Sequence, residues 1–131
     1  MATISRDIDR PSERLHDDGA VLSEAIARVA RFWALTNEEL GRVLGVSPAS
    51  ASRLKARGFD VKPGTKPFEL GQYLVRLFRG LDALLGSDDR AARSWLRSEN
   101  RELGGVPAAR LQTIQGLTEL TAYVDGYRGR S

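Results

Sequence analysis

The sequence contains no cysteine and only one histidine among its 131 residues. Without cysteine the chain can form neither a disulfide nor a thiolate metal site, which is in keeping with a reducing compartment. The one histidine, His16, lies in a polar N-terminal segment, where no further metal-ligating pattern surrounds it. We therefore expect no metal and no cofactor.

Long apolar runs are also absent. A membrane-spanning helix needs roughly 18 consecutive apolar residues, and the longest runs here are far shorter. The first residues interleave acidic and basic side chains and lack the apolar stretch of a secretion signal. We expect a cytoplasmic protein that does not enter a membrane. Its 41% hydrophobic content is sufficient for a core of one ordinary domain or two very small ones.

Strand patterns are nearly missing, whereas helix patterns run through most of the chain. Apolar residues recur at intervals of three and four over Val21–Trp33 and Glu69–Leu85, which predicts two amphipathic helices. Other helices are predicted from their caps and breakers: Thr36 to Leu44, Ser47 to about Arg57, Ser87 as N-cap through Arg97, a helix from Pro107, and Gly116–Tyr127. The predicted fold class is all-α, with a flexible arm over residues 1–18 and an irregular connection over Gly58–Pro67.

Positive charge is concentrated in one segment of the chain. Between Arg42 and Lys66 the formal charge is +5, whereas the remainder of the sequence carries −2. Such a segment is typical of a surface that binds phosphates, although a solvated helical face can have the same composition.

The basic segment overlaps the stretch "TNEELGRVLGVSPASASRLKARG", Thr36–Gly58. Two short helices joined at Gly45 are typical of a helix-turn-helix, whose second helix enters the DNA major groove. Gly41 is small where the helices would approach each other. The stretch resembles the Xre/Cro class of repressors through the pattern L-G-V-S-x-x-x-x-S. The alternative from the residues alone is an ordinary helical hairpin.

If the second helix binds DNA, its side chains limit the contacts it can make. The short residues at its N-terminus favour close approach to phosphates and methyl groups, and Arg53 is the best candidate to read a base edge. The candidate DNA-binding residues within the predicted helix-turn-helix region, residues 19–66, are Ser47, Pro48, Ala49, Ser50, Ser52, Arg53, Lys55 and Arg57.

A second resemblance lies in the stretch "WLRSENRELGGVPAARL", Trp95–Leu111. It is similar to the toxin-binding domain of the Xre/MbcA/ParS-like antitoxins, in which a helix ending in W-L precedes an Asn, a Gly-Gly turn and a further helix. The structural signature residues are Trp95, Leu96, Asn100, Leu103, Gly104, Gly105 and Pro107, with Trp95 expected in the core rather than at the toxin. Pro107 follows the glycines more closely than is usual in the family.

The two resemblances together imply an antitoxin whose residues 67–131 form the toxin-binding domain. The family implies a RES-domain toxin, an enzyme that consumes NAD or transfers ADP-ribose, whose active site the antitoxin would block. It also implies repression of the antitoxin's own operon through double-stranded operator DNA, with a homodimer and larger toxin–antitoxin assemblies. The second half shows no catalytic constellation, so we do not expect an enzyme.

The C-terminal residues are the best candidates for contacts with the toxin. Tyrosine and arginine are enriched where interfaces concentrate their binding energy. The candidate toxin-binding residues are those of these two types near the C-terminal end of the sequence, Tyr123, Tyr127, Arg128 and Arg130. Two other readings stay open at this point. The protein could be a stand-alone dimeric helix-turn-helix regulator without a toxin, or a structural adaptor that binds no DNA.

Overall fold

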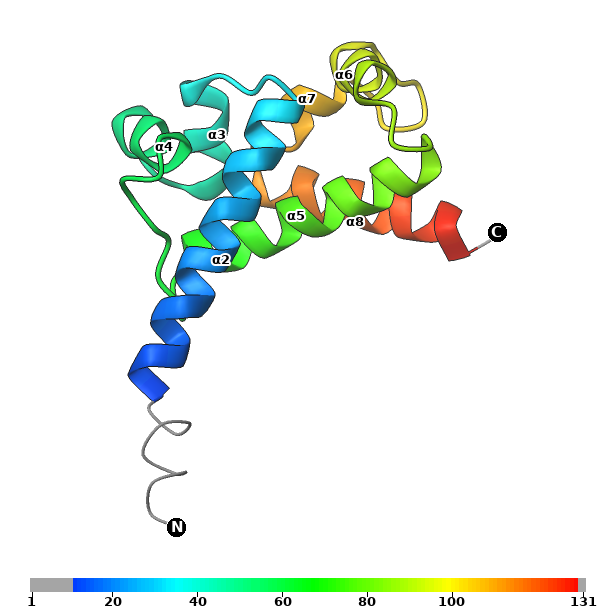
Figure 1. The fold of residues 1–131 in the computed structure, drawn as a ribbon. Coiled ribbons are helices and arrows are strands. Elements are labelled where there is room, and N and C mark those ends of the chain that lie inside the picture. The colour runs from blue at the N-terminus through cyan, green and yellow to red at the C-terminus, as the bar shows by residue number, and fades with distance from the viewer. Residues whose placement is uncertain (1–10, 130–131) are drawn as a thin grey trace.

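The computed structural model describes residues 11–129, with side chains from residue 17 onwards, and within that range the chain is helical (Figure 1). The prediction of an all-α fold is confirmed. An isolated bridge between Asn100 and Gly105 is the one β-type pairing in the described part. The helices are α2 (Pro11–Phe32), α3 (Asn37–Leu44), α4 (Pro48–Lys55), α5 (Lys66–Leu84), α6 (Asp89–Arg97), α7 (Pro107–Arg110) and α8 (Ile114–Gly129).

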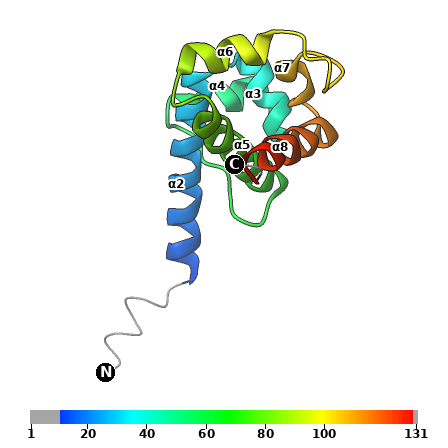
Figure 2. The same ribbon diagram turned by 90° about the vertical axis from the view of Figure 1, so that its right-hand side faces the viewer.

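Helix α5 is the centre of the molecule. It packs against α2 on one side and α8 on the other (Figures 1 and 2). Two glycines allow these close approaches: a Cβ atom at Gly71 would lie 2.5 Å from Ile26 Cδ1, and one at Gly80 would lie 2.7 Å from Val124 Cγ1. A larger side chain at either position would force the facing Ile26 or Val124 to shift.

A single hydrophobic core runs through both halves of the chain. Trp33 directly after α2, Leu74 of α5 and Leu120 of α8 are almost fully buried within it, together with Leu40 and Leu54 of the short helices. The predicted boundary between residues 66 and 67 lies at the start of α5, which contacts elements of both halves. The two halves therefore share a core, and the domain boundary stays a prediction.

Two predicted elements differ from the structure. Helix α2 begins at Pro11, so residues 11–18 of the predicted arm are helical, while residues 1–10 lie outside the described range. The apolar stripe in the sequence begins only at Val21, so it did not reveal the first turns of this helix. The N-cap of α6 is Asp88, which accepts a hydrogen bond from Ala91 N, whereas Ser87 has a φ of 62° and precedes the helix.

None of the helices in the described range is long and apolar enough to cross a bilayer.

Candidate functional site

Helices α3 and α4 form the predicted helix-turn-helix. Thr36 and Glu39 complete the capping box of α3, and Gly45 ends that helix at a φ of 75°, a left-handed conformation that glycine adopts readily. A Cβ at Gly41 would lie 2.7 Å from the carbonyl oxygen of Val46, so the turn packs directly on the preceding helix. Both glycines are required by the backbone path that sets the direction of α4.

The first turn of α4 presents short side chains to solvent. Ser47 caps the helix by accepting a hydrogen bond from Ser50 N, and Pro48 follows at a position that needs no N–H donor. Pro48, Ala49 and Ser52 are exposed. The backbone at this end of the helix is therefore open to close approach by another molecule.

Arg53 is exposed on the same helix, and two contacts within the chain orient it. Its Nη2 donates to Ser50 Oγ at 3.2 Å, and its guanidinium lies 5.8 Å from the centre of the Phe59 ring. A stacked guanidinium keeps its outward donors available while losing part of its rotamer freedom.

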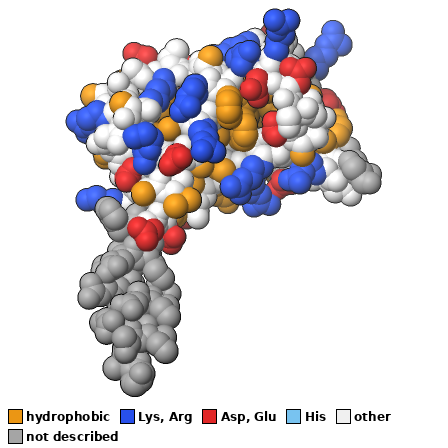
Figure 3. Space-filling model, viewed as in Figure 1, with side chains coloured by type: hydrophobic (Ala, Val, Ile, Leu, Met, Phe, Trp, Pro, Cys, Tyr) orange, Lys and Arg blue, Asp and Glu red, His pale blue; other side chains and the backbone are white. Residues whose placement is uncertain are grey.

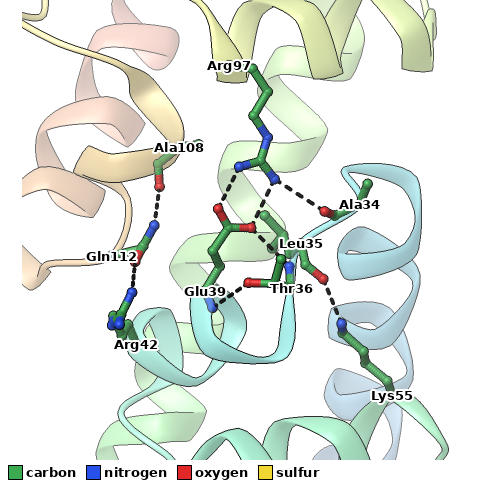
Figure 4. Close-up of polar contacts among 9 residues, drawn as sticks. All are labelled: Ala34, Leu35, Thr36, Glu39, Arg42, Lys55, Arg97, Ala108 and Gln112. Carbon is green, nitrogen blue, oxygen red and sulfur yellow. Dashed lines mark hydrogen bonds and ion pairs between the residues drawn. The ribbon is translucent and has the colours of Figure 1, made fainter.

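Lys55 and Arg57 have partners inside the chain. Lys55 Nζ donates to the Leu35 carbonyl at 2.6 Å, which fastens α4 to the loop after α2 (Figure 4). Arg57 adopts a φ of 64° and donates to Asp60 Oδ1 at 2.9 Å and to Ala20 O at 3.4 Å. Lys55 and Arg57 thus have side-chain partners within the chain, although Arg57 is exposed.

Arg97 of α6 joins the second half of the chain to the helix-turn-helix (Figure 4). It donates to both carboxylate oxygens of Glu39, at 2.5 and 2.9 Å, and to the carbonyl of Ala34 at 3.2 Å. These hydrogen bonds hold the pKa of the Glu39 carboxyl below its ordinary value, with a smaller opposing effect of burial. Glu39 therefore caps α3 and binds α6 at the same time.

A second polar contact joins the halves close by. Arg42 of α3 donates to Gln112 Oε1 at 3.2 Å, and Gln112 in turn donates to the Ala108 carbonyl at 2.8 Å (Figure 4). Arg93 of α6 also donates to the Phe32 carbonyl at the end of α2, at 2.9 Å. The region after α5 is thereby attached to both α2 and α3 by side-chain contacts as well as by the shared core.

Replacing Arg97 with Met should lower the free energy of unfolding by about 1 kcal/mol at neutral pH, because a partly exposed bidentate ion pair is lost. The pKa of Glu39 is lowered in the folded state, so its contribution is present above the pKa of the unfolded carboxyl and is lost as pH falls through the folded pKa. Urea unfolding at neutral and at acidic pH measures the difference. Arg101→Met, at an exposed arginine, is the matched control. Equal losses at both pH values would contradict a role for the charged pair.

The turn between α6 and α7 contains the signature residues of the second half. Asn100 pairs with Gly105 through two backbone hydrogen bonds, and its Oδ1 accepts from Leu103 N at 3.2 Å. Gly104 has a φ of 71°, whereas no such conformation is found at Gly105. Leu96 and Pro107 are buried, Trp95 is half-buried against the core, and Pro107 occupies the first turn of α7. These residues fix the path of the chain into α8.

The end of α8 presents two of the predicted toxin contacts together. The rings of Tyr123 and Tyr127 lie 4.9 Å apart, edge to face, and both hydroxyls bind the Glu102 carboxylate, at 2.6 and 3.1 Å. The hydrogen bond to Glu102 raises the pKa of Tyr123, since the carboxylate stabilises the protonated phenol. The exposed Tyr127 and the half-buried Tyr123 thus form a fixed aromatic pair, held by Glu102, at the molecular surface.

Arg128 is exposed but lies on another side of α8, because its Cδ is close to Gly80 of α5. Arg130 lies outside the described residues. The structure therefore groups the two tyrosines and does not place Arg128 beside them.

Sequence patterns did not reveal Glu102, Arg97 or Gln112. Their partners are distant along the chain: 58 residues separate Arg97 from Glu39, and 70 separate Gln112 from Arg42. No local periodicity or cap marks such a pair. Among the described residues there is no group of three or more His, Asp or Glu side chains that could hold a metal ion.

Two protein-family models match the chain and together span most of it. The antitoxin Xre-like helix-turn-helix domain matches residues 12–76, which include α3 and α4. The antitoxin Xre/MbcA/ParS C-terminal toxin-binding domain matches residues 80–130, which include the Asn100–Gly105 turn and α8. The two matches adjoin within α5, the helix that both halves share. No curated protein matches the sequence significantly. The chain belongs to the Xre/MbcA/ParS-like antitoxins, with an Xre-like helix-turn-helix domain followed by the family's toxin-binding domain.

Proposed function

We propose that this antitoxin neutralises a RES-domain toxin in the cytoplasm by covering its active site and represses its own operon as a homodimer. The observation that carries the proposal is the order of the two family domains, a helix-turn-helix and then a toxin-binding domain, on one shared core. Because α6 is tied to α3 through Arg97 and Glu39, a toxin bound to the second half would be held at a fixed position relative to the DNA.

On the DNA side, α4 is the proposed recognition helix. Its N-terminal residues, the exposed Ser47, Pro48, Ala49 and Ser52 and the half-buried Ser50, would contact phosphates and base methyl groups, and Arg53 would read a guanine edge. A dimer is needed because one short helix contacts too few base pairs to select a single operator. Lys55 and Arg57 would support α4 through their internal contacts instead of binding phosphate directly.

On the toxin side, the end of α8 is the proposed inhibitory segment. Tyr123 and Tyr127 are already oriented by Glu102, so little conformational entropy would be lost when they are buried at an interface. Arg128 or Arg130 would pair with acidic side chains in or beside the pocket that binds NAD or ADP-ribose.

Co-expression of the antitoxin with the product of the adjacent reading frame tests the proposal. We expect that frame to encode a RES-domain enzyme that arrests growth and depletes NAD when expressed alone, and that forms a stable complex with this chain. Cellular NAD and colony counts are the measurements, with an empty vector as control. If the chain neither binds the enzyme nor restores growth, it is instead a stand-alone dimeric regulator.

A further inference from the structure

An open groove lies between α2 and α5, and its lining contains no residue of α4 and neither Tyr123 nor Tyr127. It consists of two adjoining hollows of ≈ 660 and ≈ 460 Å³ that share Val21, Ala25, Val75 and Arg79. Figure 3 shows apolar side chains on this side of the molecule with lysine and arginine side chains around them. Val21 is 70% exposed and Phe32 is 37% exposed, although both belong to the helix that contributes most to the core of the first half. A contiguous, concave apolar surface of this kind is typical of a protein-binding site.

The charge along the groove is predominantly positive. Arg76 is paired with Asp125 at 2.6 Å, and Arg28 with Glu24 at 3.3 Å. Arg79 and Arg128 both line the larger hollow, and within the described part of the chain neither forms an ion pair. Asp18 is the acidic residue in the lining of that hollow. The partner that complements this surface carries acidic groups beside an apolar stripe.

Two other occupants fit the groove less well. A second copy related by a two-fold axis would bring the central Arg79 towards its own counterpart, since a two-fold interface pairs the same surface with itself. Like charges opposed in this way disfavour association. DNA would match the arginines but not an apolar floor made by Leu22, Ala25 and Val75.

We propose that the groove between α2 and α5 binds an acidic amphipathic segment of the toxin. This inference rests on the proposed function and extends it, because it adds a second contact surface that includes the helix-turn-helix half. Arg128 connects the two surfaces: it follows Tyr127 in α8 and lines the groove. In this arrangement the end of α8 covers the active site of the toxin, and the groove between α2 and α5 binds a second segment of the same toxin.

The test uses the full-length antitoxin and the purified enzyme from the adjacent reading frame. Val21→Asp places a carboxylate at the exposed edge of both hollows, beside their apolar floor, and Arg79→Glu reverses the central charge. Each substitution should raise the dissociation constant of the antitoxin–toxin complex about 10-fold. The matched control is Arg31→Glu, an exposed arginine on the same helix that lines a separate hollow beside Thr36 and Lys55. It should bind like the wild type. Thermal unfolding of each variant checks that the fold is retained. We expect it to be retained, because Val21 and Arg79 are exposed.

A photo-crosslinking amino acid in place of Val21 identifies the occupant directly. In the complex we expect crosslinks to a toxin peptide that carries Asp or Glu beside apolar residues. Crosslinks to a second antitoxin copy, or none to the toxin, would overturn the inference, as would affinities of Val21→Asp and Arg79→Glu within about twofold of the wild type. If those variants bind normally while removal of residues 126–131 abolishes neutralisation, the groove proposal fails and the proposed function stands. If the wild type forms no complex, both fail.

Discussion

Deletion of residues 126–131 is expected to abolish neutralisation of the toxin while leaving operator binding unchanged. The deletion removes Tyr127, Arg128 and Arg130, three of the four proposed toxin contacts. It removes no buried residue, because the last buried side chain of α8 is Val124. Tyr123 keeps its hydrogen bond to Glu102 but loses its aromatic neighbour. Hot-spot tyrosines and arginines each contribute about 2 kcal/mol or more to an interface, so losing them together should reduce affinity by several orders of magnitude.

The measurement is growth of cells that express the toxin with either antitoxin, beside a gel-shift assay of the same proteins on DNA from upstream of their gene. Deletion of residues 130–131 alone is the matched control, and it separates Arg130 from the part of α8 that the structure describes. The double variant Tyr127→Ala with Arg128→Ala should reproduce most of the loss without shortening the chain. Protection of cells by the 126–131 deletion would refute the assignment of these residues to the toxin interface.

Local sequence signals predicted the helices that carry the functional residues. The Thr36–Glu39 capping box, Gly45 and the Ser47-Pro48 pair each have a physical effect within one turn of helix, and the structure contains all of them. The same holds for the turn at Asn100 and Gly104, where a side-chain hydrogen bond and a positive φ determine the chain path. Features that depend on neighbours in sequence can therefore be predicted from the sequence.

Features that depend on packing between distant segments could not be predicted in this way. The basic residues between Arg42 and Lys66 look alike as sequence, yet Lys55 is half-buried against the Leu35 carbonyl and Arg57 is paired with Asp60, while Arg53 is exposed on α4. Likewise, helix geometry alone separates Tyr127 from Arg128, but only the packing of α8 shows that Tyr127 meets Glu102 while Arg128 lies near Gly80 of α5. Only the fold distinguishes a cation that supports a helix from one that is available to a ligand.

The single core also affects how the two domains can influence each other. Glu39 belongs to the cap of α3 and binds Arg97 of α6, while Leu35, in the adjoining loop, accepts from Lys55 of α4. Contacts therefore run continuously from the toxin-binding domain through the loop at Ala34–Thr36 to α4 (Figure 4). Under the proposed function, toxin bound against α6 would act on the position of α4 through these hydrogen bonds, a physical route for tighter operator binding by the complex.

Replacement of Arg53 with Ala is expected to reduce affinity for the operator about 30-fold, which corresponds to the loss of about 2 kcal/mol from one bidentate contact with a base. The effect should be far smaller on a scrambled duplex, because a base contact contributes to sequence preference and a phosphate contact contributes to all DNA alike. Arg53 is exposed, so its removal should leave the fold intact despite the loss of the contacts to Ser50 and Phe59. Fluorescence anisotropy with DNA from upstream of the gene and with its scrambled version measures both affinities.

Lys62→Ala is the matched control for that experiment, because Lys62 is an exposed cation of the same basic segment that lies outside α4. It should weaken binding to both duplexes by the same small factor and reduce the salt dependence of binding. The comparison isolates base reading from general attraction to phosphate. If Arg53→Ala behaved like Lys62→Ala, lowering affinity for both duplexes while sequence preference stayed intact, Arg53 would be a phosphate contact, and the sequence would have to be read by the short residues Ser47–Ser50 at the start of α4.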